Sequence, residues 1–350
     1  MDAPLLPSGL RVGHWTDEKA ATGCTVFLFD RGARAAVHRY APATSTRHMD
    51  PLDATGSERA IHGLLFTGGS AFGLGASNGV MEVLAQRGIG VPTRGGRVPR
   101  VPAAVIHDLA IGSPGRWPQA EDAAAATIAA SRERPREGNV GVGTGATLGK
   151  PLDLAQAMKG GFGVSLSTDA PSTQAPDPGT PPGTPTPPFL GVFVVVNALG
   201  DLLDPATGQI IAGCHEKTAS GPRWLGPSIY NKIPRPRMSA EENTTLALIA
   251  TDAKLSRDEL RFVAQTASQA LTRTLRPAGT PFDGDLVFAV SLATEGDGAA
   301  PRGQEPNAYV QLAYAASEHL ERAMLRAVRH ARASSGVPAA CPPSDPHGQT

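Results

Sequence analysis

Short runs of apolar residues recur along this chain, separated by polar or glycine-rich stretches. Four of them are rich in β-branched or aromatic residues and are bounded by residues typical of turns. Apolar runs this short, without a polar face, are typical of strands that are buried on both faces. The sequence therefore predicts buried strands at 24–29, 191–197, 245–251 and 286–292.

Other segments show the spacing of an amphipathic helix. At 257–275 the apolar residues share one helical face, Ser256 and Glu259 form a capping-box pattern before it, and Pro277 follows it. Residues 308–332 predict a second long helix, and the alanine-rich segments 70–87 and 119–132 predict two more. Strands and helices therefore interleave, which predicts an α/β or α+β fold with buried sheets.

Three segments interrupt this order. Residues 168–188 are dominated by proline, threonine and glycine, which predicts a solvated, extended insertion. Residues 215–242 are polar and contain four prolines, and we expect the tail 334–350 to be flexible.

Length and composition exclude several classes of protein. The chain has 350 residues, which by itself suggests about two domains. Its 32 basic and 32 acidic residues balance, so we expect no nucleic-acid partner. The longest apolar run is too short to span a bilayer and the N-terminus lacks a signal-peptide pattern, so we expect no membrane partner. Three scattered cysteines indicate a reducing, cytoplasmic location.

Two glycine-rich segments invite a ligand-binding interpretation. Residues 138–150 fail the P-loop pattern because Thr144 stands where a glycine is needed and Pro151 follows Lys150. Residues 64–79 fail the nucleophile-elbow pattern because Phe72 replaces its last glycine. Tight turns and close backbone packing are the simpler interpretation of both segments. The start of the helix near Ser70 and Phe72 remains a candidate substrate contact.

Two further features are ambiguous when taken alone. Asp283 and Asp285 flank a glycine just before a predicted strand, a pattern that is common in plain turns. The nine histidines show no metal-ligand spacing, and His107 is the one inside an apolar stretch, where a packed core histidine is the simpler interpretation.

Asn243-Thr244-Thr245, at the seam between a polar loop and a predicted strand, has three interpretations. It fits a glycosylation sequon, although nothing else indicates secretion. It also fits the ordinary start of a strand, which threonine favours. In the third interpretation, the Thr244 hydroxyl attacks the preceding carbonyl and cuts the chain. The freed α-amine, with a reference pKa of about 7.7–8.0, then serves as a general base beside the nucleophile.

Several motifs in order favour the third interpretation. The segments 138–150, 193–208, 243–260 and 274–294 together resemble the DmpA-type self-processing hydrolases, which include L-aminopeptidase/D-amidases, β-aminopeptidases and nylon-oligomer hydrolases. VGHWTD at 12–17, TGGSAFGL at 67–74 and VPAAVIHDLAIG at 101–112 are also similar to that family. The resemblance extends from about residue 10 to residue 333, apart from the proline-rich insertion.

The resemblance implies an α+β fold of four layers, an αββα sandwich like that of N-terminal-nucleophile (Ntn) hydrolases, in one domain spanning 1–333. It implies cleavage between Asn243 and Thr244 into chains 1–243 and 244–350, with Thr244 as nucleophile. Asp283, Asp285, Lys150 and Asn197 match the family's other catalytic positions. Asn197 is suited to donate to an oxyanion, and backbone amides near Gly68–Ser70 or Gly143 are candidates for a second donor. No metal or cofactor is implied.

Departures from the family leave the substrate open. His107 stands where nylon-oligomer hydrolases have tyrosine, whereas a threonine nucleophile is shared with them and the aminopeptidases use serine. We therefore expect a small peptide or oligoamide of the 6-aminohexanoate type, with an aminopeptidase or D-esterase acting on short or β-peptides as the alternative. The rivals are an acyltransferase, which the Asn-Thr-Thr context disfavours, and a non-cleaving binding protein of the same fold. The resemblance also implies a homo-oligomer, a tetramer of cleaved pairs.

Overall fold

The structure is a computed structural model that describes residues 5–52, 59–169, 188–218, 221–226, 228–229, 242–293 and 308–340. The predicted insertion at 168–188 therefore lies almost wholly outside the described residues, as do much of the polar segment 215–242 and residues 341–350. Within the polar segment, a hairpin of β14 (His215–Thr218) and β15 (Gly221–Trp224) is present. Among the described residues, no helix is long and apolar enough to cross a membrane.

The four predicted strands are confirmed. They belong to one nine-stranded sheet that is continuous through β2 and packs on itself as two layers, which are called the two sheets below. One sheet contains β10 (Gly161–Leu166), β11 (Leu190–Asn197), β16 (Thr244–Thr251) and β18 (Leu286–Ser291) in that order. The other contains β1 (Leu10–Asp17), β4 (Ile61–Thr67), β7 (Ala103–Val105) and β3 (Thr46–Arg47). Strand β2 (Thr22–Arg39) belongs to both, since its first half pairs with β1 and β4 and its second half pairs with β18.

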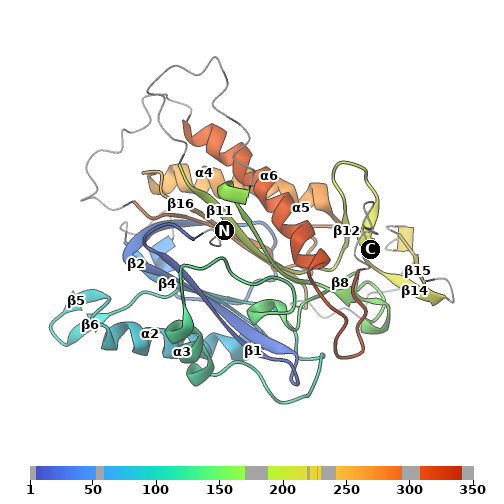
Figure 1. Ribbon diagram of the computed structural model, residues 1–350, viewed down its shortest axis with the longest axis horizontal. Helices are drawn as coiled ribbons and strands as arrows, with labels where there is room; N and C mark the ends of the chain where they lie inside the picture. Colours follow the sequence, from blue (N-terminus) through green and yellow to red (C-terminus); the bar gives the residue numbers. More distant parts are fainter. Residues whose placement is uncertain are drawn as a thin grey trace, which may run out of the picture.

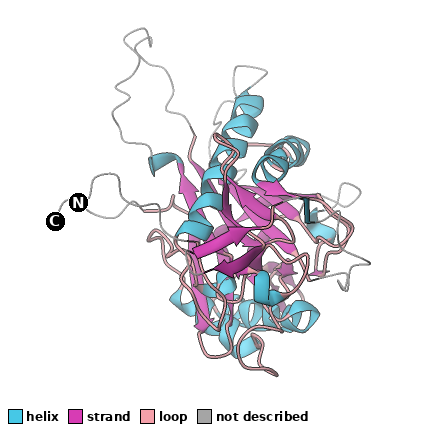
Figure 2. Ribbon diagram, turned by 90° about the vertical axis from the view of Figure 1, so that its right-hand side faces the viewer, coloured by secondary structure: helices cyan, strands magenta, loops and turns pink. Residues whose placement is uncertain are grey.

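The predicted helices are also present and form the outer layers (Figure 1). Helices α4 (Arg257–Ala267), α5 (Gln269–Thr274) and α6 (Ala308–Arg329) cover the sheet that contains β11 and β16. Helices α2 (Ser77–Gln86) and α3 (Ala120–Ala129), with the single turn α1 (Ser70–Gly73), cover the other sheet. Seen from the side, helices flank the strands on two faces (Figure 2). The layers thus follow the order α, β, β, α, as expected.

Alternation along the strands explains why the layers stack in this way. In β11, Val192, Val194 and Val196 face the helical layer of α4–α6. The intervening Phe193 and Val195 face the other sheet and meet Phe27 and Phe66 of β2 and β4. Phe27 contacts Phe66 and Phe193 edge to face, with ring centroids 5.3 Å apart in both pairs. A strand with two buried faces needs a continuous apolar run, which is the pattern in the sequence.

Local signals set the helix boundaries. Ser256 and Glu259 form the predicted capping box at the start of α4. The predicted helix 257–275 is divided at Ser268, whose hydroxyl bonds the Gln265 carbonyl at 2.7 Å.

Short elements complete the fold. They are β5 (Val91–Thr93), β6 (Gly96–Val98), β8 (Thr147–Leu148), β9 (Met158–Lys159), β12 (Asp201–Leu203), β13 (Ile210–Ala212) and β17 (Leu275–Arg276). Val337 and Ala340 are buried, and the Pro338 carbonyl accepts a bond from the Lys159 amide of β9. Residues 334–340 are therefore packed, unlike the flexible tail that we expected to begin at residue 334.

Candidate active site

Thr244 is the first residue of β16 and lies at the end of the sheet that contains β10, β11 and β18. It is 4% exposed, and its hydroxyl lies 2.7 Å from the carbonyl oxygen of Asn243, the residue before it. The antiparallel register with β11 places Asn197, the last residue of that strand, directly opposite Thr244. Two of the predicted site residues are thus brought together by strand pairing alone.

The Asp283–Asp285 turn approaches Thr244 from the other side. Parallel pairing of β16 with β18 continues past the strand ends as a bridge between Asn243 and Asp283. The Gly284 amide donates to the Asn243 carbonyl at 2.7 Å, and an Asp285 carboxylate oxygen accepts from the Thr245 amide at 2.6 Å. Asp283 accepts from the amide and hydroxyl of Thr280 at 2.9 and 2.6 Å.

Both carboxyl groups of this turn are buried, which favours their protonated forms. Burial, followed by the nearby Asp283 carboxylate, raises the pKa of Asp285. Burial also raises the pKa of Asp283, although hydrogen bonds from Thr280 and the charge of Lys150 oppose the rise. A carboxyl whose pKa is raised toward neutrality suits a group that must accept and return a proton.

Lys150 and Asn197 form the opposite wall of the site. The Lys150 ammonium donates to the Asn197 side-chain oxygen at 3.0 Å, the Asn197 carbonyl at 3.2 Å and the Glu242 carbonyl at 3.1 Å. The Thr147 amide also donates to the Asn197 side-chain oxygen, at 3.0 Å. The Asn197 nitrogen is thereby turned toward carbonyl groups, those of Glu242 at 3.2 Å and His107 at 3.3 Å.

Burial lowers the pKa of Lys150 to about 7, even though the charges of Asp283 and Glu242 act to raise it. A lysine with this pKa changes its charge near neutrality, which is a property of lysines that take part in proton transfer.

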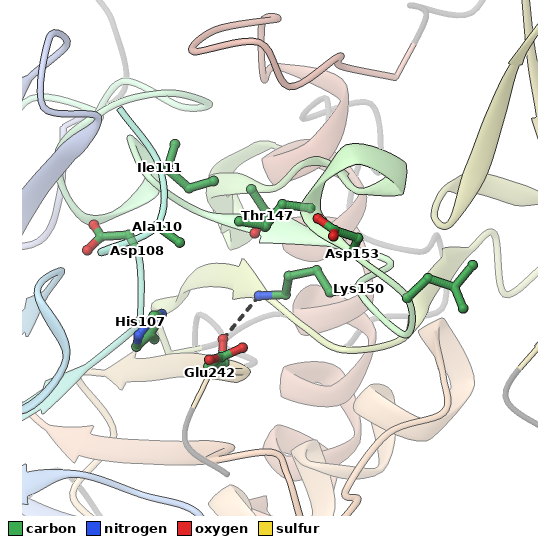
Figure 3. Close-up of a pocket in the computed structure, with 10 residues that line it drawn as sticks. His107, Asp108, Ala110, Ile111, Thr147, Lys150, Asp153 and Glu242 are labelled. Atoms are coloured by element: carbon green, nitrogen blue, oxygen red, sulfur yellow. Dashed lines mark hydrogen bonds between the residues drawn. The ribbon is translucent and has the colours of Figure 1, made fainter. Parts of the chain in front are cut away.

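A pocket of about 250 Å³ opens beside this wall (Figure 3). Its lining residues are His107, Asp108, Ala110, Ile111, Thr147, Lys150, Leu152, Asp153, Leu154 and Glu242. In Figure 3 a dashed line joins the Lys150 nitrogen to Glu242, whose carbonyl accepts this hydrogen bond. Glu242 is among the lining residues, whereas Thr244 is not.

Asp108 and Lys159 are a second pair of buried titratable groups near the pocket. Asp108 accepts from the Thr22 hydroxyl and the Gly69 amide, each at 2.7 Å, and burial raises its pKa to about 6. Lys159 is fully buried and donates to the Thr144 carbonyl at 2.7 Å. The Lys159 bond ties the 138–150 turn to β9, and the Asp108 bonds tie the segment around His107 to the start of β2 and to Gly69.

The two glycine-rich segments serve close packing. A Cβ on Gly143 would lie 2.3 Å from the Phe162 amide nitrogen, and one on Gly68 would lie 2.1 Å from an Asp108 oxygen. The candidate second oxyanion donors are wrong for this conformation. Gly69 donates to Asp108, Ser70 to Ile106, Gly68 to Gly23 and Gly143 to Val140, so these amides are already bonded within the chain.

The structure separates the remaining candidates. His107 lines the pocket. Ser70 and Phe72 do not line it, and Phe72 is 62% exposed and stacked on Trp117 with ring centroids 4.7 Å apart. Their contact with substrate stays a prediction. Among the described residues, no cluster of three His, Cys, Asp or Glu side chains is placed to hold a metal ion.

Sequence reasoning missed Thr147, Glu242 and the Gly284 amide. Thr147 and Glu242 act here through backbone groups or as a support for another side chain, and such roles leave no residue-type signal. Gly284 was visible in the Asp-Gly-Asp pattern, but only the two carboxylates were considered.

Comparisons with known proteins identify the family of this chain and agree with its fold. Residues 8–340 match peptidase family S58. The chain is 35% identical to an uncharacterized aminopeptidase of Mycobacterium tuberculosis (strain ATCC 25618 / H37Rv) over 347 residues, covering 94% of each chain. It is 28% identical over 292 residues to the 6-aminohexanoate-oligomer endohydrolase of Kocuria sp. (strain KY2), covering 81% of this chain and 73% of that enzyme.

A solved structure supports the fold independently. The L-aminopeptidase D-Ala-esterase/amidase of Ochrobactrum anthropi, described as a variant of the Ntn hydrolase fold, aligns with a TM-score of 0.65 at 16% identity. The alignment covers 97% of this chain and 93% of that one.

The αββα sandwich of this chain is therefore the fold of that Ntn-hydrolase variant. The chain belongs to peptidase family S58.

Proposed function

We propose that this peptidase cuts its own chain between Asn243 and Thr244, and that Thr244 then acts as the N-terminal nucleophile of an amidase. The observation that carries the proposal is the 2.7 Å contact between the Thr244 hydroxyl and the Asn243 carbonyl oxygen. In the same place a backbone amide and two buried carboxyls are grouped around the peptide bond. A plain strand start explains the Gly284 amide, which continues the strand pairing, but it does not explain the two buried carboxyls.

Self-cleavage proceeds as an N-to-O acyl shift. The Thr244 oxygen forms a bond to the carbonyl carbon of Asn243, and its proton passes to the Asp283/Asp285 pair. The bond from that carbon to the Thr244 nitrogen then breaks, and the nitrogen takes up the proton. Water hydrolyses the resulting ester, which leaves a carboxylate on Asn243 and a free amine and hydroxyl on Thr244.

Turnover reuses the same groups on a substrate amide. The free α-amine of Thr244 accepts the hydroxyl proton, since its reference pKa of about 7.7–8.0 suits a base at neutral pH. Asp283 and Asp285 hold that amine in place, and Asn197, oriented by Lys150 and Thr147, donates to the oxyanion. The acyl group forms an ester on Thr244, and water releases it.

Peptide-like or oligoamide substrates of the 6-aminohexanoate type fit the site. Apolar side chains of Ile111, Leu152 and Leu154 line the pocket and suit a polymethylene or short aliphatic acyl chain. The 6-aminohexanoate-oligomer endohydrolase among the relatives supports this class. An aminopeptidase on short or β-peptides is the alternative, supported by the similarity to the mycobacterial aminopeptidase. A cytoplasmic location and a tetramer of cleaved pairs stay predictions.

The direct test is hydrolysis by purified protein of linear 6-aminohexanoate oligomers beside short α- and β-peptide amides, with Thr244→Ala as control. Activity on at least one amide class, absent in the variant and unchanged by EDTA, is the expected result. Equal activity in the variant, or loss of activity in EDTA, would overturn the mechanism.

A further inference from the structure

Two neighbouring carbonyl groups at the cut site have separate hydrogen-bond donors. The Glu242 carbonyl accepts from Lys150 at 3.1 Å and from the Asn197 side chain at 3.2 Å. The Asn243 carbonyl, which belongs to the bond to be cut, accepts from the Gly284 amide at 2.7 Å. The wall expected to stabilise an oxyanion is therefore bonded to the wrong carbonyl for self-cleavage.

The position of the Gly284 amide follows from the fold. The parallel pairing of β16 with β18 extends to the Asn243–Asp283 bridge, which directs this amide at the Asn243 oxygen. A glycine is needed there because a Cβ would lie 2.4 Å from the Ala43 carbonyl oxygen and 2.9 Å from the Thr244 hydroxyl. The donor is thus a backbone amide that strand pairing holds in place.

We propose that the Gly284 amide is the oxyanion donor of self-cleavage, and that Lys150 and Asn197 are occupied by the Glu242 carbonyl until the cut is made. This inference rests on the proposed self-cleavage. When the Thr244 oxygen attacks, the negative charge develops on the Asn243 oxygen, to which the Gly284 amide already donates. A fixed donor at that point stabilises the charge without reorganisation.

The pocket supports the same order of events. Glu242 lines it, whereas Thr244 lies behind and is 4% exposed. A substrate carbonyl can reach Asn197 only when the Glu242 carbonyl has left, and it can reach Thr244 only when the peptide 242–243 has moved. Cutting therefore converts a site that binds its own chain into one that binds a substrate.

The test removes the Gly284 N–H alone. Cell-free synthesis with glycolate in place of Gly284 gives an ester at this position, and the appearance of the two fragments is followed by mass. We expect cleavage to slow by about 10²–10³-fold, the effect of losing one oxyanion donor in other enzymes. Cleavage of the ester chain at the rate of the unmodified chain would overturn the inference.

A matched control separates this effect from weakening of the turn. The ester also weakens the Asp283 carbonyl, which accepts from the Ala43 amide at 2.9 Å. Lactate in place of Ala43 removes that bond and leaves the Gly284 amide intact. We expect this chain to cleave within a few-fold of the unmodified one. A loss equal to that of the Gly284 ester would assign the effect to the turn and overturn the inference.

Limited proteolysis checks that the ester chain folds. Asn197→Ala supplies a second test that does not depend on that chain. Lys150 still holds the Glu242 carbonyl in this variant, so cleavage should slow by no more than about tenfold. Amide turnover by the cleaved variant should fall by about 10²-fold or more. Complete loss of cleavage would overturn the division of donors. An unmodified chain that never cleaves would instead refute the proposed function.

Discussion

The carbonyls of Glu242 and Asn243 are one residue apart in the chain but lie in opposite surroundings. The first is held by an ammonium and a side-chain amide, from Lys150 and Asn197. The second lies between the Thr244 hydroxyl and the Gly284 amide, on the side where Asp283 and Asp285 are buried. The cationic wall therefore positions the chain, while the acidic turn faces the bond that we propose is cut.

This contrast depends on the end of β11 and the start of β16 lying at the same level of the sheet. Asn197 ends β11 and Thr244 begins β16 in one antiparallel register, and β18 brings the acidic turn from the other side. A shift of one residue in this strand register would turn every side chain of the shifted strand to the opposite face, so the two groups of donors would no longer meet the chain at these carbonyls.

Removing a carboxyl group from the acidic turn should have the largest effect on self-cleavage. Asp285→Asn keeps an acceptor for the Thr245 amide but cannot take the hydroxyl proton. We expect self-cleavage to slow by about 10²–10⁴-fold, measured as fragment formation over time after cell-free synthesis. Asp201→Asn is the matched control, since Asp201 is a buried carboxyl outside the site that bonds the Cys214 amide at 2.8 Å. Normal cleavage in Asp285→Asn would show that the base lies elsewhere.

Lys150, on the cationic side, should make the free energy of unfolding depend on pH. The folded-state pKa of Lys150 is lowered to about 7, so between pH 7 and about 10 the unfolded chain binds more protons than the folded one. The free energy of unfolding therefore rises with pH in that window.

The comparison is made in the uncut Thr244→Ala chain, with and without Lys150→Met. From pH 6 to pH 9 the lysine-containing chain should gain about 3 kcal/mol relative to the methionine variant, measured by urea unfolding. Parallel pH curves for the two chains would mean that Lys150 is not desolvated in the folded state.

Adding a methyl group at Gly284, where the turn closely approaches Thr244, should have a smaller effect than these changes. Gly284→Ala places a methyl group against the Ala43 carbonyl and the Thr244 hydroxyl. We expect a loss of about 1–3 kcal/mol in unfolding free energy, together with slower cleavage. Gly75→Ala, where a Cβ meets nothing within 4 Å, should be nearly neutral in both measurements. If Gly284→Ala were equally neutral, the close approach of the turn would be in doubt.

The smallest effect should come from a position remote from both carbonyls. Ser256→Ala removes the cap of α4, whose hydroxyl accepts from the Glu259 amide at 3.3 Å. We expect a loss of about 1 kcal/mol in stability by thermal or urea unfolding and an unchanged cleavage rate. A large change in cleavage would show that the site responds to packing across the whole helical layer.

Much of the fold could be predicted because its signals are local. The apolar runs of β11, β16 and β18, and the capping box at Ser256, depend only on neighbouring residues. The full length of β2 could not be predicted, because its second half, GARAAVHR, lacks an apolar run and is held by pairing with β18.

The site divides in the same way. The side chains of Thr244, Asp283, Asp285, Lys150 and Asn197 were predicted from motifs. Strand pairing brings together all but Lys150, which joins them through its bond to Asn197. The orientation of Asn197 by Thr147, and the capture of the Glu242 carbonyl, depend on contacts between residues 45 to 92 apart in the chain. Such contacts are set by tertiary structure and leave no trace in residue type.

The central claim, self-cleavage at Thr244, is tested most directly by the intact mass of the purified protein beside Thr244→Ala. The account predicts two fragments in the unmodified protein, 1–243 and 244–350, and one uncut chain in the variant. A single uncut chain in both, even after long incubation, would contradict it. The fold and the family would stand, but the free amine on which the proposed mechanism depends would not exist.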